Sequence, residues 1–186
     1  MITKEEGAES ELTLRDEYTP GPAREAQVLK DGEKWTLILV RELRHSPLTV
    51  WQALTNPVQL RQWAPFEVDG NLDRVKAIVK LTWLGTGHVS ETTVTRADAP
   101  RVLEFYDIRW ELEPLGRGTR LTLWHSIDKR FIAWGAAGWH ICFDVLDRLL
   151  EGAPIGRIAG RDAMNFGWQR LVGQYATQFG GESPAS

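Results

Sequence analysis

The residues best suited to chemistry are four histidines and a single cysteine, and two of them stand close together in GWHICFDVLDRLLEG, residues 138–152. A histidine and a cysteine two positions apart could form a base–nucleophile pair or contribute ligands to a metal ion. On a helix, however, His140 and Cys142 would project about 200° apart and could share neither a proton nor a ligand. Their chemistry therefore depends on whether this segment is helical.

The spacing of apolar residues in this segment predicts an amphipathic helix over residues 138–151. Cys142 would lie on its apolar side, where unpaired cysteines are commonly buried. His140 would form a polar-face pair with Asp144, four positions later, and Gly152 is suited to end the helix. We therefore expect a core helix and not a catalytic motif. Its apolar arc holds Trp139, Cys142, Phe143, Val145, Leu146, Leu149 and Leu150.

His125 is the most promising polar side chain for a functional site. It lies in residues 108–127, IRWELEPLGRGTRLTLWHSI, which predict a β-hairpin turning at LGRG. On the second strand, His125 shares a face with Leu121 and Leu123. It could hydrogen-bond a ligand there, or act as a general acid or base if a carboxylate held it. The alternative is a core histidine satisfied by the backbone or by water. No other catalytic residue is identified.

Motifs for metals and cofactors are missing from the sequence. His45, His88, His125 and His140 do not have the HxH or HxxxH spacing of metal ligands, and one cysteine cannot build a structural zinc site. No glycine-rich dinucleotide fingerprint follows a strand, and neither a P-loop nor a GxSxG elbow occurs. We therefore expect no metal and no cofactor.

The composition is that of an ordinary globular protein. With 186 residues, 42% of them hydrophobic and 25% charged, the chain fits one domain with appendages. A single cysteine excludes an internal disulfide and suits a reducing cytoplasm. We expect no signal peptide, because no positively charged start is followed by an apolar run, and no membrane span, because no stretch approaches 18 apolar residues. A net charge of −3 gives no electrostatic reason to expect a nucleic-acid partner.

Local signals predict a strand, two short helices and then an antiparallel sheet. Residues 34–43, KWTLILVREL, predict a strand covered on both faces. Ser46 followed by Pro47 predicts the start of one short helix, and Asn56 the start of a second. Short turns join the segments that follow, which indicates antiparallel pairing. The further expected strands are residues 75–83, 88–98 and 101–107, followed by the hairpin over residues 108–127.

Both ends of the chain differ from this central region. Residues 1–33 contain nine acidic and four basic side chains, hence a net charge of −5, and predict a mobile acidic tail. Near the other end, Asp162 could cap a helix whose apolar stripe runs to Gly180. We therefore expect a tail, a domain over residues 34–152, and residues 153–186 as a loop plus an accessory helix. The stripe on that helix could pack on the domain or serve a homodimer.

Tryptophans are concentrated in the predicted domain. Eight of the nine lie between Trp35 and Trp139, and one small core is hard to fill with so many large rings without leaving a cleft. Flat, rigid rings suit an apolar or aromatic ligand. The candidates for an aromatic wall are Trp63, Trp83, Trp110, Trp139 and Phe143.

The order of elements and three sequence stretches resemble a known superfamily. A strand, a bent helix pair, antiparallel strands and a long helix form the α+β helix-grip plan. VRELRHSPLTVWQALTNPVQLRQW, residues 40–63, resembles the opening of the SRPBCC (START/Bet v 1-like) superfamily, in the branch related to the activator of Hsp90 ATPase. WELEPLGRGTRLTLWHSI and GWHICFDVLDRLLEG resemble the final strands and helix of that branch. The resemblance covers residues 34–152.

This resemblance implies a hydrophobic cavity between the sheet and the long helix. Members of the superfamily include lipid and sterol carriers, plant hormone sensors and polyketide cyclases or dehydratases. The chain would then bind a hydrophobic or aromatic small molecule without covalent chemistry. The implied ligand-binding residues are Trp63, Trp83, Trp110, Leu121, Leu123, His125, Trp139 and Phe143.

Two further functions remain open at this point. One is a cyclase-like or dehydratase-like enzyme that uses His125 as acid or base, which requires a buried polar pair inside the cavity. The other is a protein-interaction module, for which we expect an interior filled by side chains and an exposed apolar or charged patch. The eukaryotic co-chaperone carries a separate N-terminal Hsp90-binding domain, which residues 1–33 cannot supply. An Hsp90-type chaperone partner is therefore not expected.

Overall fold

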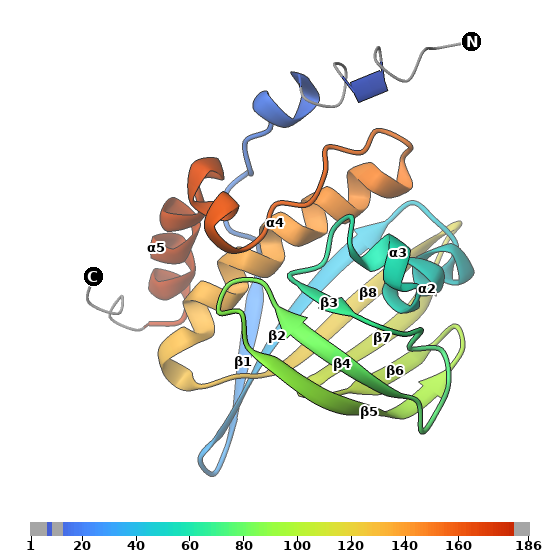
Figure 1. The fold of residues 1–186 in the computed structure, drawn as a ribbon. Coiled ribbons are helices and arrows are strands. Elements are labelled where there is room, and N and C mark those ends of the chain that lie inside the picture. Colours follow the sequence, from blue (N-terminus) through green and yellow to red (C-terminus); the bar gives the residue numbers. More distant parts are fainter. Residues whose placement is uncertain (1–6, 9–12, 181–186) are drawn as a thin grey trace.

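The fold is a curled antiparallel sheet that wraps around one long helix (Figure 1). In the computed structural model, which describes residues 7–8 and 13–180, eight strands follow the order β1-β2-β8-β7-β6-β5-β4-β3. This is the predicted α+β helix-grip plan. The strands are β1 (Ala26–Asp31), β2 (Lys34–Leu43), β3 (Phe66–Val68), β4 (Ile78–Trp83), β5 (Val89–Asp98), β6 (Val102–Phe105), β7 (Ile108–Leu115) and β8 (Gly118–Ser126).

Two short helices follow β2, as predicted, and lie against the curled sheet (Figure 1). The side-chain oxygen of Ser46 accepts a hydrogen bond from the backbone nitrogen of Thr49 (3.3 Å), and Pro47 is the first residue of α2. The side chain of Asn56 caps α3 in the same way. The helices are α2 (Pro47–Thr55), α3 (Pro57–Leu60), the short 3-10 helices η1 (Lys129–Phe131) and η2 (Gly160–Phe166), α4 (Ile132–Leu150) and α5 (Trp168–Gln178).

The long helix α4 begins six residues earlier than predicted. Gly135 and Gly138 lie in its first turns, and glycine disfavours helix formation in isolation. Packing explains Gly135, because a Cβ there would lie only 2.9 Å from Cδ1 of Ile127. A Cβ on Gly138 would lie 4.0 Å from the indole nitrogen of Trp168, an ordinary contact distance, so packing does not account for this second glycine. Among the described residues, no helix combines the length and the apolar character needed to cross a bilayer.

The N-terminal segment is a correction to the predicted tail. Residues 26–31 form β1, which pairs along β2 from Ala26 opposite Leu39 to Asp31 opposite Lys34. Only Ala26 and Val28 of this strand are partly buried, which is too short an alternation to reveal a strand in the sequence. The edge of β2 supplies its hydrogen bonds. Residues 1–6 and 9–12 of the predicted tail lie outside the described residues.

The C-terminal segment differs from the single helix predicted from Asp162 to Gly180. Gly167, with φ of +80°, separates η2 from α5, since a left-handed conformation cannot continue a helix. Asp162 lies within η2 and does not cap α5. The apolar stripe of α5 is buried within the chain, and its buried residues are Leu171, Val172, Tyr175 and Ala176.

A buried polar cluster joins the outer side of α4 to its neighbours. Nη1 of Arg41, on β2, lies 2.6 Å from Oδ1 of Asp144, and the Tyr18 hydroxyl donates to Oδ2 of Asp144 (2.6 Å). Burial and the Asp144 carboxylate raise the pKa of Tyr18, so the phenol remains a donor. Nδ1 of His140 lies 2.8 Å from the Tyr175 hydroxyl. The polar side of α4 is therefore covered by α5 and the N-terminal segment. The prediction that His140 lies on a polar, solvent-facing side of the helix was wrong, because this side chain is buried.

We predict that Arg41→Met destabilises the protein much more than Arg44→Met. Arg41 is 3% exposed, and its loss would leave the Asp144 carboxylate without its cation, which costs about 3–5 kcal/mol for buried pairs. Arg44 pairs with Glu151 but is 85% exposed, so the control should cost about 0–1 kcal/mol. Urea unfolding of both variants measures the difference. Equal losses of the free energy of unfolding in the two variants would contradict this role of the cluster.

A second prediction concerns acid stability. Burial lowers the pKa of His140 to about 4, below the usual value of a histidine, so the unfolded chain binds a proton at this residue more readily than the folded chain. The free energy of unfolding should therefore fall as pH drops from about 6.5 towards 4, by about 2–3 kcal/mol for this residue. The glutamine of His140→Gln cannot be protonated in this range. The free energy of unfolding of this variant, measured with urea, should therefore fall by about 2–3 kcal/mol less than that of the native protein between pH 7 and pH 4.5. An unchanged pH dependence would show that His140 does not titrate as described.

Candidate functional site

The concave side of the sheet and the inner face of α4 enclose an aromatic chamber. All the side chains predicted to bind ligand face this space together with those of the core. His125 is 8% exposed, Trp83 is half-buried, and the others are buried. The set comprises Trp63, Trp83, Trp110, Leu121, Leu123, His125, Trp139 and Phe143.

Aromatic rings fill the chamber. The ring centroids of Trp110 and Trp139 lie 5.5 Å apart at an interplanar angle of 86°, and those of Trp63 and Trp110 lie 6.1 Å apart. Phe143 packs 5.9 Å from Trp139. The Trp110–Trp139 and Trp63–Trp110 pairs have the edge-to-face arrangement that aromatic pairs prefer, whereas Phe143 is tilted by 34° against Trp139. In place of the open cavity expected from the resemblance, the interior is a packed aromatic cluster.

Trp83, Tyr106 and His125 form the mouth of the chamber, where β4 and β8 end. The rings of Trp83 and His125 are stacked, with centroids 5.6 Å apart and planes 5° from parallel. Tyr106 lies 6.2 Å from Trp83 and is 40% exposed. The mouth is therefore lined by rings that are less deeply buried than Trp63 and Trp110.

Hydrogen bonding fixes the chemical state of His125. The indole nitrogen of Trp139 donates to Nδ1 of His125 (3.1 Å), and burial lowers the pKa of His125 to about 4. The imidazole is thus neutral at pH 7, and its proton resides on Nε2, because Nδ1 serves as acceptor. No described residue accepts a hydrogen bond from Nε2, and burial is the sole cause of the lowered pKa, with no contribution from a carboxylate. Among the described residues, Nε2 of His125 is therefore a hydrogen-bond donor without a partner.

Cys142, the other potentially reactive side chain, is a poor nucleophile in this structure. Cys142 is buried on the inner side of α4, as predicted, and burial raises the pKa of its thiol to about 12. A thiol so far from ionisation is a poor nucleophile. Across the described ranges, no cluster of three or more His, Cys, Asp or Glu side chains is arranged to hold a metal ion.

Sequence reasoning missed three aromatic residues of the chamber. Phe66 and Phe105 are buried, with ring centroids 5.7 Å apart, and Tyr106 lies at the mouth. Phe66 belongs to a strand of only three residues, which gives no periodic signal. Phe105 and Tyr106 lie in a segment predicted as a strand, but Tyr106 has a φ of +53°, which turns the chain towards β7.

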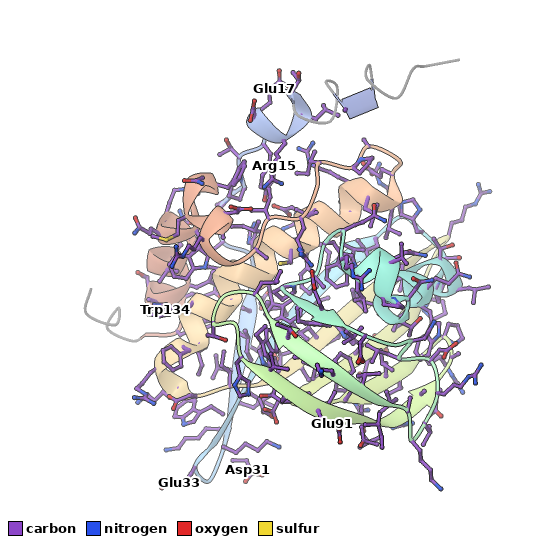
Figure 2. The ribbon with its side chains drawn as sticks, in the orientation of Figure 1. Arg15, Glu17, Asp31, Glu33, Glu91 and Trp134 are labelled. Atoms are coloured by element: carbon purple, nitrogen blue, oxygen red, sulfur yellow. The ribbon has the colours of Figure 1, made fainter. Side chains whose placement is uncertain are left out.

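An aromatic patch also lies on the outside of the molecule. Phe131 and Trp134 are 40% and 38% exposed, with ring centroids 5.4 Å apart. Trp168 of α5 lies 5.8 Å from Trp134. Figure 2 shows Trp134, which belongs to the first turn of α4, at the surface. We call Phe131, Trp134 and Trp168 the outer aromatic patch.

Comparison with known proteins agrees with this architecture. Residues 44–151 match the family described as Activator of Hsp90 ATPase homolog 1-like protein. Among solved structures, CalU16 from Micromonospora echinospora is 21% identical and has a TM-score of 0.62, with 83% of this chain and 95% of that chain covered. EF2215 from Enterococcus faecalis, a protein of unknown function, is 17% identical with a TM-score of 0.63, covering 84% and 91%. No curated protein matches.

Proposed function

Because the chain belongs to the Activator of Hsp90 ATPase homolog 1-like family, a branch of the SRPBCC superfamily, we propose that it binds a hydrophobic or aromatic small molecule between the sheet and α4. The observation that carries the proposal is His125. Its Nε2 is a neutral donor without a described partner, at the mouth of the aromatic chamber. Such a group orients a ligand that presents an acceptor at the edge of an apolar ring.

Binding requires that the ligand take the place of a protein ring. Trp83 is the ring best suited to move, because it is half-buried at the mouth, whereas Trp63 is fully buried and its indole nitrogen donates to the Ala53 carbonyl (2.9 Å). A flat aromatic ligand could replace the Trp83 ring over His125 with little loss of buried apolar area. The filled chamber is then the ligand-free state of a site that opens at its mouth.

Native mass spectrometry of the protein as purified from cells tests the proposal directly. Excess mass of a few hundred daltons that disappears on denaturation supports binding and provides the ligand for identification. A ligand-free mass that does not change on incubation with fatty acids, sterols and aromatic polyketides would contradict it.

We predict that His125→Phe lowers the affinity for 2-acetonaphthone, whose carbonyl can accept from Nε2, by about tenfold. The affinity for naphthalene, which has no acceptor, should stay the same, because a phenylalanine ring can stack on the ligand that replaces Trp83 as the imidazole ring does. Quenching of tryptophan fluorescence measures both, with circular dichroism to verify folding.

Trp134→Ser provides the matched control. It removes a ring from the outer aromatic patch without touching the chamber, so it should leave both affinities unchanged. A loss of affinity in this variant, and not in His125→Phe, would place the ligand on the outer surface.

A protein-interaction module is the second candidate function. Two observations favour it: the chamber is filled by side chains, and the outer aromatic patch exposes large apolar rings near one end of α4. Under this reading the purified protein carries no small molecule, and the patch contacts another protein chain.

A further inference from the structure

We propose that the surface depression between the β4–β5 turn and the segment after α4 binds a carboxylate or phosphate group through Arg157. The inference rests on the proposed function, since it makes the ligand an aromatic or apolar molecule with an acidic group. The depression has a volume of about 490 Å³. Its lining includes Leu84, Gly85, Arg157, Gly160, Arg161 and Asp162.

The guanidinium group of Arg157 has unused hydrogen-bonding capacity. Its Nη2 donates to Oε1 of Glu67 on β3 (2.8 Å), whereas Nη1 is buried and has no hydrogen-bond partner among the described residues. A buried charged donor without a partner is costly, and such groups in native proteins commonly contact an ion or water. An oxyanion is the partner that a guanidinium group binds most strongly.

The charges around the depression favour an anion. Arg157 and Arg161 both line it. Two carboxylates pair with arginines at this place. Glu67 forms an ion pair with Arg157, and Asp162, whose side chain is 62% exposed, forms one with Nη2 of Arg15 at 3.5 Å. Three arginines thus stand against two carboxylates, which leaves one net positive charge for a bound anion.

The segment that carries Arg157 is held firmly against the domain. Nη1 of Arg15 donates to the backbone carbonyls of Ile155, Gly156 and Arg157 at 3.0–3.2 Å, and Figure 2 shows Arg15 beside this segment. Gly160 has a φ of +59°, and a Cβ there would lie 3.2 Å from the Leu84 carbonyl oxygen. Only glycine combines this backbone conformation with so close a contact to the turn.

The depression begins where β4 ends. Leu84, which lines it, directly follows Trp83, whose ring forms the mouth. On the other side, Sγ of Cys142 on α4 lies 3.9 Å from the Ile158 carbonyl oxygen. A ligand whose acidic group is bound by Arg157 could therefore extend past Leu84, so that its aromatic or apolar portion reaches Trp83.

The test compares 2-naphthoate with the neutral 2-naphthamide in titrations followed by tryptophan fluorescence. The native protein should bind the anion about tenfold more tightly than the amide. Arg157→Gln should abolish this preference while leaving affinity for the amide unchanged. Arg44→Gln, which removes an exposed arginine at the far end of α4, should retain it. Equal affinities for both compounds in the native protein, or a preference that survives Arg157→Gln, would overturn the proposal.

A second variant allows the proposal to be tested even if Arg157→Gln does not fold. Glu67→Gln removes the carboxylate that competes for Arg157, and Glu67 is 39% exposed, so the fold should tolerate the change. This variant should bind 2-naphthoate several-fold more tightly than the native protein. Weaker or unchanged binding would count against Arg157 as the anion-binding group.

Titration with inorganic phosphate and with acetate separates the subsite from the proposed function. Amide NMR signals of Gly85 and Gly160 report on the depression, and the anion that shifts them in the native protein but not in Arg157→Gln identifies the preferred group. Such shifts without binding of either naphthalene compound would support the subsite and contradict the aromatic ligand. No shift with either anion would overturn the subsite, even if 2-naphthamide binds in the chamber.

Discussion

The packing of Trp139 against the concave face of the sheet is the contact on which the rest of the structure depends. From the middle of α4, its ring lies within 6.5 Å, centroid to centroid, of six other rings. These six rings come from α3–β3, β4, β7, β8 and α4 itself, so one side chain fixes how the helix sits in the sheet. The same indole donates to His125 and thereby selects the tautomer that leaves Nε2 as a donor. The six rings belong to Trp63, Phe66, Trp83, Trp110, His125 and Phe143.

The opposite side of α4 is held by polar contacts instead of rings. Arg41, Asp144 and Tyr18 tie the helix to β2 and to the N-terminal segment, and His140 ties it to α5. Helix α4 is thus clamped from outside, so a ligand that needs space in the chamber gains it more easily by moving rings at the mouth than by lifting the helix. The half-buried Trp83 and the exposed Tyr106 meet this requirement.

The sequence predicts the framework of the site well, because local signals determine it. Lys34–Leu43 was predicted to the residue, and the Ser46 and Asn56 caps begin the helices expected from them. The alternation along β8 correctly brings Leu121, Leu123 and His125 to the side that faces α4. Whether these residues bind a ligand remains a proposal.

Features that arise from tertiary packing could not be predicted from the sequence. The burial of His140 depends on α5, whose Tyr175 lies 35 residues further along the chain and contacts the polar side of α4. The filled chamber could not be foreseen, because the number of tryptophans does not give the volume available to them. Arg157 gives no signal in its GRIAG context, since its role depends on Glu67 and on the β4–β5 turn, both distant in sequence.

Indole N–H signals in a two-dimensional NMR spectrum test the central claim, binding between the sheet and α4, most directly. The nine tryptophans report separately on the chamber and on the surface. On addition of 2-acetonaphthone, the signals of Trp83 and Trp139 should shift most, since one ring is displaced and the other donates to the histidine that the ligand contacts. Shifts confined to Trp134 and Trp168 would show that the ligand stays on the outer aromatic patch, and would contradict a binding site inside the chamber.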